Sequence, residues 1–110
     1  MQRLIRYFLS LGMVCLVAFV ATTQAQSDPA TIYKTNCVMC HGPDGNADTP
    51  TGKTLHAKDL RSEEVQTKSK GELADVITKG NGAMPAFGSK LSPADIQELV
   101  AYVRNLAKKK

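Results

Sequence analysis

The chain has 110 residues, of which 14 are Lys or Arg and 10 are Asp or Glu, with three Cys and no Trp. This length allows one domain and excludes a second independent core. A charged fraction of 22% and an apolar fraction of 43% exclude a wholly disordered chain.

Residues 1–25 have the layout of a secretory signal peptide. Arg3 and Arg6 precede a mainly apolar run over residues 8–21, and small residues before the boundary suit cleavage after Ala25. The apolar run is short for a bilayer-spanning helix, which needs ~20 residues. An uncleaved membrane anchor is the alternative. We therefore expect export, to the periplasm if the cell is Gram-negative.

Removal of this signal leaves residues 26–110 as the expected domain. The loss of Arg3 and Arg6 leaves 12 basic and 10 acidic residues, a net charge of +2. The remaining excess is roughly the run of lysines at 108–110. No basic helix face or aromatic platform accompanies it in the sequence, so the composition gives no case for nucleic-acid binding.

The first helix of this domain is expected to begin at Pro29. Asp28 is the expected N-cap, and proline suits the first helical position. Apolar residues follow at helical spacing as far as Cys37. Gly42 then breaks the helix, so this helix delivers residues 37–41 near its end.

Residues 37–41 read Cys-Val-Met-Cys-His, which is the C-x-x-C-H pattern of c-type haem attachment. On one helical turn, Cys37 and Cys40 lie on the same face, so each can form a thioether to a haem vinyl group. His41 follows directly, and its imidazole can then bind the iron. Haem c is attached outside the cytoplasm, in agreement with the export signal.

Three other interpretations of the cysteine pair remain open. A thioredoxin-like dithiol needs a strand–helix context, and no β-rich run precedes Cys37. A zinc site would use Cys37, Cys40, His41 and His56, although adjacent Cys40 and His41 are awkward ligands for one metal. A disulfide is the simplest structural alternative, but so small a loop would constrain the unfolded chain very little.

The middle of the chain alternates between turn-forming and helical patterns. Residues 43–58 are rich in Gly and Pro and are expected to form an irregular loop. A short helix is expected over about 60–67. Ser69 and Glu72 form a capping box, with apolar residues at helical spacing behind it. Gly80 is expected to end that helix.

The loop after Gly80 offers a second axial ligand for the iron. Met84 lies in segment 80–88, where glycines allow close backbone approach and Pro85 stiffens the chain after Met84. Met39 lies between the two cysteines and cannot reach the opposite face. His56 is the alternative ligand, but a lone His in a polar stretch is usually a surface residue. Met84 is therefore the preferred candidate.

The last helix is expected to open at Ser92, with Pro93 at its first position. Its apolar stripe comprises Ile96, Leu99, Val100, Val103 and Leu106. The sequence contains neither an alternating strand pattern nor an internal repeat. The expected fold class is all-α.

With these motifs in place, the chain resembles a class I cytochrome c, a small fold of three to four helices around one haem. The resemblance covers residues 29–107 and rests on the C-x-x-C-H motif, the Gly-rich loop and the last helix. In that family an aromatic residue from each terminal helix meets at their crossing, and by position these are Tyr33 and Tyr102. The family often has a glycine there, whereas this chain has Pro29 and Ala30.

The resemblance also implies the chemistry of the site. In the family a proline carbonyl accepts the ring N–H of the histidine ligand, and Pro50 is the candidate here. Phe87 is the candidate for an aromatic residue against the haem. With both axial positions filled by His41 and Met84, no open site remains for a substrate. The expected function is one-electron transfer rather than enzyme catalysis, and the thioether ligand raises the potential.

In this family the thioether edge of the haem is exposed. The expected docking patch for a redox donor and acceptor therefore comprises Met39, Cys40, Pro85 and Ala86, with short-lived contacts. The modest net charge argues against one dominant electrostatic steering. We expect a monomer. The alternatives are a haem subunit of a larger oxidoreductase, and a haem peroxidase or gas-binding haem in which Met84 is labile.

Overall fold

The computed structural model describes residue 21 and residues 27–109. This part of the chain contains no strand and six α-helices: α2 (Pro29–Asn36), α3 (Val38–His41), α4 (Pro50–Leu55), α5 (Glu63–Gln66), α6 (Lys70–Lys79) and α7 (Pro93–Lys108). The all-α prediction is confirmed, with more helices than the three to four expected. The predicted signal peptide falls almost wholly outside the described residues.

The first helix begins as predicted but ends earlier. The Asp28 side chain accepts a hydrogen bond from the backbone N–H of Thr31 at 3.1 Å, and Pro29 is the first residue of α2. At the other end, the Thr35 hydroxyl and the Asn36 amide donate to backbone carbonyls four residues back, at 2.9 and 3.0 Å. Such bonds compete with the helical ladder and bend it. Cys37 is the C-cap of α2 and separates it from α3.

The prediction of one continuous helix over the C-x-x-C-H motif is therefore wrong. Cys37 has φ −118° and ψ −31°, and α3 starts at the next residue. The expected loop over 43–58 is also only partly irregular, because it contains α4. Thr49 caps α4, accepting from the backbone N–H of Gly52 at 2.8 Å, and Pro50 is its first residue. The Thr-Pro pair was the signal for this helix.

The two following helices differ in how well they match the sequence. Helix α5 is shorter than the expected 60–67. Helix α6 has the predicted capping box: the Ser69 hydroxyl accepts from the Glu72 N–H at 3.1 Å, and the Glu72 carboxylate accepts from the Ser69 N–H at 2.6 Å. Gly80, with φ +75°, ends α6 as expected.

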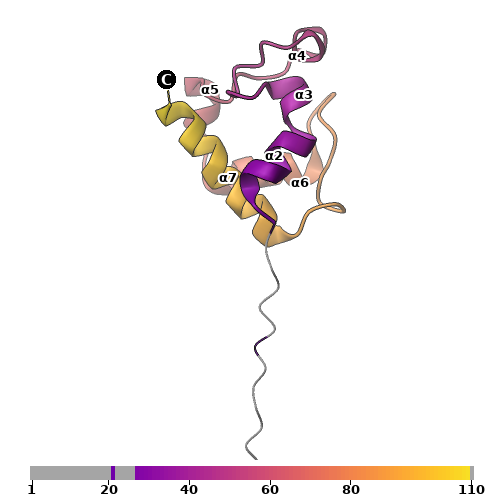
Figure 1. The fold of residues 1–110 in the computed structure, drawn as a ribbon, viewed down its shortest axis with the longest axis vertical. Coiled ribbons are helices and arrows are strands. Elements are labelled where there is room, and N and C mark those ends of the chain that lie inside the picture. The colour runs from indigo at the N-terminus through magenta and orange to yellow at the C-terminus, as the bar shows by residue number, and fades with distance from the viewer. Residues whose placement is uncertain (1–20, 22–26, 110) are drawn as a thin grey trace, which may run out of the picture.

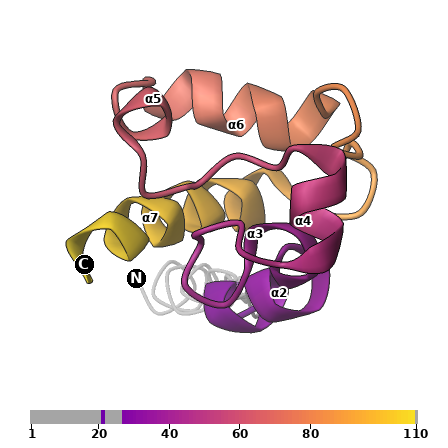
Figure 2. The ribbon, with the colours of Figure 1, turned by 90° about the horizontal axis from the view of Figure 1, so that it is seen from above.

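Helix α7 is the longest helix of the described chain and organises the core. Figure 2 shows it between α6 on one side and α2 on the other, and these two pairs are among the most extensive helix contacts. Figure 1 shows the helices arranged around the centre of the molecule. The predicted stripe of α7 is buried in full: Ile96, Leu99, Val100, Val103 and Leu106.

The crossing of α2 and α7 uses the predicted aromatic pair. The ring centroids of Tyr33 and Tyr102 lie 4.9 Å apart. Ala30 is exposed, so it does not occupy the close-contact position expected for it, and Ile32 and Tyr33 are the buried residues of α2. The helix contact therefore depends on large side chains rather than on a small residue.

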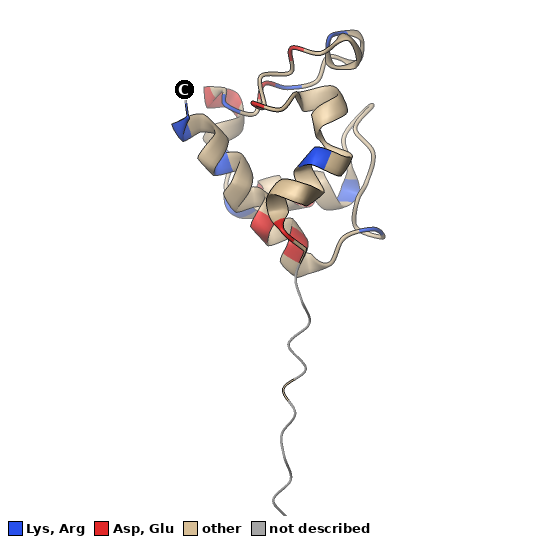
Figure 3. Cartoon of the chain, viewed as in Figure 1, with Lys and Arg blue, Asp and Glu red and all other residues tan. Residues whose placement is uncertain are grey.

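The charges on α7 follow its dipole. Acidic side chains lie near its first turn and basic ones at its last turn, as Figure 3 shows. This arrangement stabilises both helix ends. Within the part of the chain that the structure describes, no helix has the length and apolar character needed to cross a membrane.

Candidate functional site

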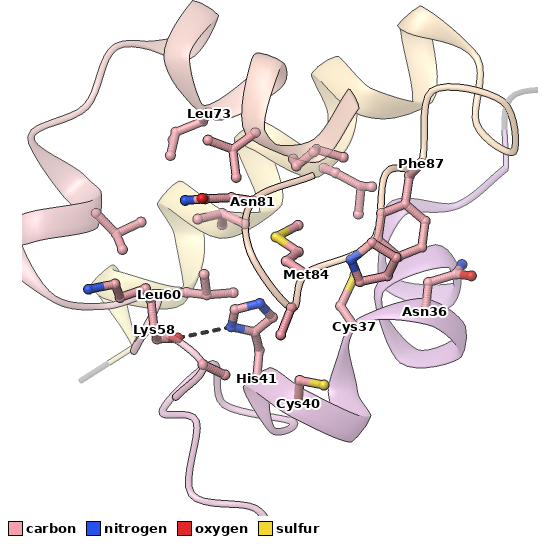
Figure 4. A pocket seen from close by; sticks show the side chains of 18 of the residues that line it. Asn36, Cys37, Cys40, His41, Lys58, Leu60, Leu73, Asn81, Met84 and Phe87 are labelled. Atoms are coloured by element: carbon pink, nitrogen blue, oxygen red, sulfur yellow. Dashed lines mark hydrogen bonds between the residues drawn. The ribbon is translucent and has the colours of Figure 1, made fainter. Parts of the chain in front are cut away.

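A cavity of about 410 Å³ lies between the helices, and all four predicted site residues line it: Cys37, Cys40, His41 and Met84 (Figure 4). This volume is within the ~300–1,000 Å³ typical of ligand and cofactor pockets. The rest of the wall is mainly apolar, with side chains that include Leu60, Val65, Leu73, Val76, Ile77, Phe87, Leu91, Leu99 and Val103.

A backbone carbonyl that follows α4 in the chain orients the side chain of His41. Its Nδ1 donates to the carbonyl oxygen of Lys58 at 2.9 Å (Figure 4). Because a carbonyl only accepts, this bond places the ring proton on Nδ1 and leaves the lone pair on Nε2. In metal-binding histidines, a hydrogen bond from the ring nitrogen that does not bind the metal orients the ring. The Nε2 atom of His41 is therefore free to bind a metal.

The prediction that Pro50 supplies this carbonyl is wrong. Pro50 is the first residue of α4, and its carbonyl accepts from the Thr54 hydroxyl at 3.0 Å inside that helix. The carbonyl that accepts from His41 is instead that of Lys58, which follows α4 in the chain. Any residue type has a carbonyl, so no pattern of residue types distinguishes Lys58 from its neighbours.

Helix α4 packs directly on the C-x-x-C-H turn. The Thr49 hydroxyl donates a shared hydrogen bond to the carbonyls of Met39 and Cys40, at 2.8 and 3.1 Å. Gly52 makes the close approach possible, because a Cβ there would collide with the Cys40 carbonyl and lie 2.9 Å from that of Ala47. Sequence reasoning missed both roles, although the Thr-Pro-x-Gly pattern could have pointed to them.

The residue after the histidine is fixed from the first helix. The Tyr33 hydroxyl donates to the carbonyl of Gly42 at 2.7 Å, and both residues are buried. Gly42 has φ +79°, a backbone conformation that glycine adopts without strain. Burial raises the pKa of Tyr33 well above its usual range, so its hydroxyl remains a donor at neutral pH.

The two cysteines are free and half-buried, so the disulfide alternative is not the state of this structure. Burial, and then the neighbouring Cys40, raise the pKa of Cys37 to about 11. The bare polypeptide therefore presents a protonated thiol at Cys37 at neutral pH. Among the described residues, no three His, Cys, Asp or Glu side chains cluster as a bare metal ion requires.

Met84 lies in a tight turn that α6 holds at both ends. Asn81 and Met84 exchange backbone hydrogen bonds of 3.1 and 3.0 Å across the turn. After the turn, the N–H of Phe87 donates to the carbonyl of Ile77 at 2.9 Å. At the start of the turn, Gly80 approaches the loop so closely that a Cβ would lie 2.6 Å from the Met84 carbonyl.

The other residues singled out from the sequence lie at or near the same cavity. Phe87 is buried and lines it, as expected for an aromatic residue against a cofactor. His56 also lines it, but it is exposed and ends α4 in a left-handed conformation, φ 54°. Met39 is 74% exposed, in agreement with the expectation that it is no ligand. Pro85 and Ala86 are exposed on the Met84 loop.

The chemistry of this donor set fits a covalently attached haem. Two thiols one helical turn apart can form thioether bonds, while an imidazole nitrogen and a thioether sulfur can bind iron. The apolar wall suits a large, mainly apolar ring better than it suits a hydrated ion. No buried side-chain polar atom of the described residues lacks a hydrogen-bond partner.

Comparisons with known proteins agree with this site. A family model described as "Cytochrome C oxidase, cbb3-type, subunit III" matches residues 24–103. The cytochrome c6 of a Synechocystis species is 37% identical over 103 residues, which cover 91% of this chain and 76% of that protein. The cytochrome c6 of a Picosynechococcus species is 40% identical over 83 residues, which cover 71% of this chain and 70% of that protein.

A solved structure, the KustC0563 c-type cytochrome, has the same fold. It aligns with a TM-score of 0.67 and 33% sequence identity, over 73% of this chain and 98% of that one. Motif, fold and relatives therefore lead to one family. The chain belongs to the class I c-type cytochromes, which are electron carriers with one covalently bound haem c and not enzymes.

Proposed function

We propose that this chain is an exported one-electron carrier whose haem c is attached through Cys37 and Cys40, with His41 and Met84 as axial ligands of the iron. The observation that carries the proposal is the convergence of these four side chains on one mainly apolar cavity. They come from two segments more than forty positions apart in the chain. The bond from His41 to the Lys58 carbonyl further supports the assignment, since it leaves Nε2 free.

The residues of the site suit electron transfer with little rearrangement. When bound, haem supplies a one-electron Fe(III)/Fe(II) couple. The Lys58 carbonyl holds the His41 ring in one orientation and strengthens the imidazole as a donor. The turn around Met84 is tied to α6, so the thioether is held in place. The apolar wall excludes water and disfavours the additional positive charge of the oxidised state.

Redox proteins are the partners of such a carrier, and we place their docking patch at Met39, Cys40, Pro85 and Ala86. Met39 is 74% exposed, although a Met side chain is usually buried. Pro85 and Ala86 are exposed beside Met84, and Cys40 is half-buried beside the cavity. A small apolar patch suits the weak, short-lived contacts of redox encounters. We also propose that the carrier is a monomer.

We further propose that residues 1–25 are a cleaved signal peptide and that the mature domain, residues 26–110, resides in the periplasm. The basic start and the short apolar run support export. Intact mass of protein from the cell envelope tests the cleavage. The expected mass is that of a chain beginning at Gln26 plus one haem, and a mass that retains residues 1–25 would favour the membrane anchor.

The axial ligands are tested by comparing Met84→Ala with His56→Ala. Both residues line the cavity, so the second variant is a matched control. In the oxidised wild type we expect a low-spin spectrum with a weak long-wavelength methionine-to-iron band. Met84→Ala is expected to lose that band, lower the potential and bind cyanide readily. If His56→Ala does so instead, the methionine assignment is wrong.

The covalent attachment has an independent test. Cys37→Ser combined with Cys40→Ser is expected to lose haem on acid–acetone extraction, whereas the wild type keeps it. If the double variant retained haem through denaturation, the thioether assignment would be wrong. His41→Ala is expected to give no stable holoprotein.

A second candidate function is that of a haem subunit within a larger oxidoreductase. The matching family model is itself described as a subunit of a cytochrome c oxidase, which favours this candidate. Purification of the native protein distinguishes the two. A carrier elutes alone at the size of one domain, while a subunit elutes with its partner chains.

A further inference from the structure

Helix α5 is a short wall of the cavity, with one side chain in the buried core. It has four residues, and helices so short are not stable on their own. Its only buried side chain is Val65. The helix pairs in closest contact within the described chain do not include α5. Yet Glu64, Val65 and Lys68 all line the cavity, so a displacement of α5 would open it.

Two side chains secure this wall to α7, and we name their hydrogen bonds the Gln66–Arg104 latch. The Arg104 guanidinium donates through Nη1 to the carbonyl of Gln66 at 2.9 Å, and through Nη2 to the carbonyl of Lys68. The Gln66 amide donates to the carbonyls of Leu60 and Val103, at 2.6 and 3.2 Å. The bonds that reach α7 join segments more than thirty positions apart in the chain.

The chemistry of the latch suits the end of a short helix. The last carbonyls of a helix have no partner within it, and they carry the negative end of the helix dipole. A guanidinium satisfies two carbonyls at this end with charge-assisted bonds, which are stronger than neutral ones. Through Leu60 and Val103, the Gln66 amide extends the same connection to two further residues of the cavity wall.

A nearby ion pair contributes little to holding α5 in place. Lys58 and Glu64 meet at 2.9 Å, but their side chains are 61% and 60% exposed. Exposed pairs of this kind contribute little because water screens them. Arg104 and Gln66 are half-buried, and their bonds to the carbonyls of Leu60, Val103 and Gln66 are partly buried and so better shielded, whereas the bond to the Lys68 carbonyl is exposed.

We propose that Gln66 and Arg104 are positioning residues that keep α5 closed over the haem cavity and so restrict the entry of water and small ligands. Neither residue is a ligand in the proposed site. This inference rests on the proposed function in so far as the cavity holds the haem. In the working carrier, the latch preserves a dry site in which the ligands do not exchange.

The first test is amide hydrogen exchange of the holoprotein, which needs no assumption about the iron ligands. In Arg104→Met we expect exchange of the segment 61–69 to rise about tenfold or more, the effect of losing a charge-assisted hydrogen bond, while α2 stays unchanged. Arg104→Lys keeps the positive charge but loses the planar pair of N–H donors. Its exchange rate at 61–69 should lie between those of the wild type and Arg104→Met. Arg61→Met is the matched control, since within the described residues the Arg61 guanidinium bonds to Asp59, two positions away, and not to α7.

The second test is the rate of cyanide binding to the oxidised holoprotein. Arg104→Met should bind cyanide faster, in proportion to the opening of α5, and Arg61→Met should match the wild type. Unchanged exchange at 61–69, an equal rise in every helix, or opening of α5 without faster cyanide binding would each overturn the proposal. A wild type that binds cyanide at once would instead contradict the Met84 ligation, and the exchange test would still decide the latch.

A second variant covers the case in which Arg104→Met yields no holoprotein. Gln66→Leu removes the bonds to Leu60 and Val103 but leaves the carbonyl of Gln66 to accept from Arg104. We expect faster exchange at 61–69 in this variant as well. Exchange equal to that of the wild type would contradict the role of the amide and overturn the latch as described.

Discussion

The substitution Tyr33→Phe removes one oxygen atom from the buried contact behind the histidine. The Tyr33 hydroxyl donates to the Gly42 carbonyl at 2.7 Å, and Tyr33 is only 2% exposed. Phenylalanine keeps the ring that packs 4.9 Å from Tyr102. The variant therefore isolates the hydrogen bond from the aromatic packing at the crossing of α2 and α7.

The expected cost is that of one lost hydrogen bond, because the Gly42 carbonyl also accepts from the backbone N–H of Gly45 at 3.1 Å and keeps that partner. The net contribution of such a bond is about 0.5–1.5 kcal/mol. For a domain of this size, each kcal/mol lowers the melting temperature by about 4–8 °C. We therefore expect Tyr33→Phe to melt about 2–12 °C below the wild type, with the haem still attached.

Thermal unfolding of the holoprotein, followed by far-UV circular dichroism, measures this difference. Tyr102→Phe is the control, because within the described chain its hydroxyl makes no hydrogen bond and its ring is retained. We expect that control to melt closer to the wild type than Tyr33→Phe does. Equal melting temperatures for Tyr33→Phe and the wild type would refute the reasoning, since the Gly42 carbonyl would then not depend on the phenol.

The pH dependence provides a second check on the same bond. Burial raises the pKa of Tyr33 above its unfolded value of 10.0. The stability contributed by the protonated phenol is thus fully present below pH 10 and is lost as the pH rises above it. The stability difference between the wild type and Tyr33→Phe should therefore shrink in alkaline solution. A difference that stays constant to about pH 11 would contradict the raised pKa.

Two further predictions concern the ends of α6. Gly80→Ala should lower the melting temperature and weaken the methionine-to-iron band, because a Cβ there would lie 2.6 Å from the Met84 carbonyl. Gly82→Ala is the control for backbone strain alone, since Gly82 also has a positive φ but a Cβ on it would meet nothing within 4 Å; equal effects would contradict the steric argument. At the other end of α6, the hydrogen bond from the Ser69 backbone lowers the pKa of Glu72. The capping box should therefore stabilise the fold at any pH above the usual carboxyl pKa. This stabilisation should be lost as the pH falls through the lowered pKa of Glu72. The melting temperature of Glu72→Gln should accordingly differ from that of the wild type at neutral pH and approach it in acid, and a difference independent of pH would count against the capping box.

Local patterns predicted several helix boundaries. The N-caps Asp28, Ser69 and Ser92 and the terminating Gly80 were all recognisable, because each acts on backbone groups within four positions of itself. The buried stripe of α7 was recognisable for the same reason, since helical spacing alone places its residues on one face. Helix α4 was missed because its glycine and proline were taken as loop residues.

The candidate haem-binding residues could likewise be proposed from the sequence, since the proposal depends on particular side chains. Cys37, Cys40 and His41 lie within one short motif, and Met84 lies in a loop with few rival donors. The structure brings these residues to one cavity. Pro50 was the wrong choice of acceptor for the His41 ring N–H. The acceptor is a backbone carbonyl, that of Lys58, and every residue has a backbone carbonyl.

From the amino-acid sequence alone, this protein's fold class, several of its helix caps and its candidate haem-attachment residues could be inferred. Only the tertiary structure decided that the Lys58 carbonyl holds His41 and that Arg104 secures α5. The physical reason is that these contacts end on peptide carbonyls, which every residue has. Which carbonyl is used depends on how distant segments pack together.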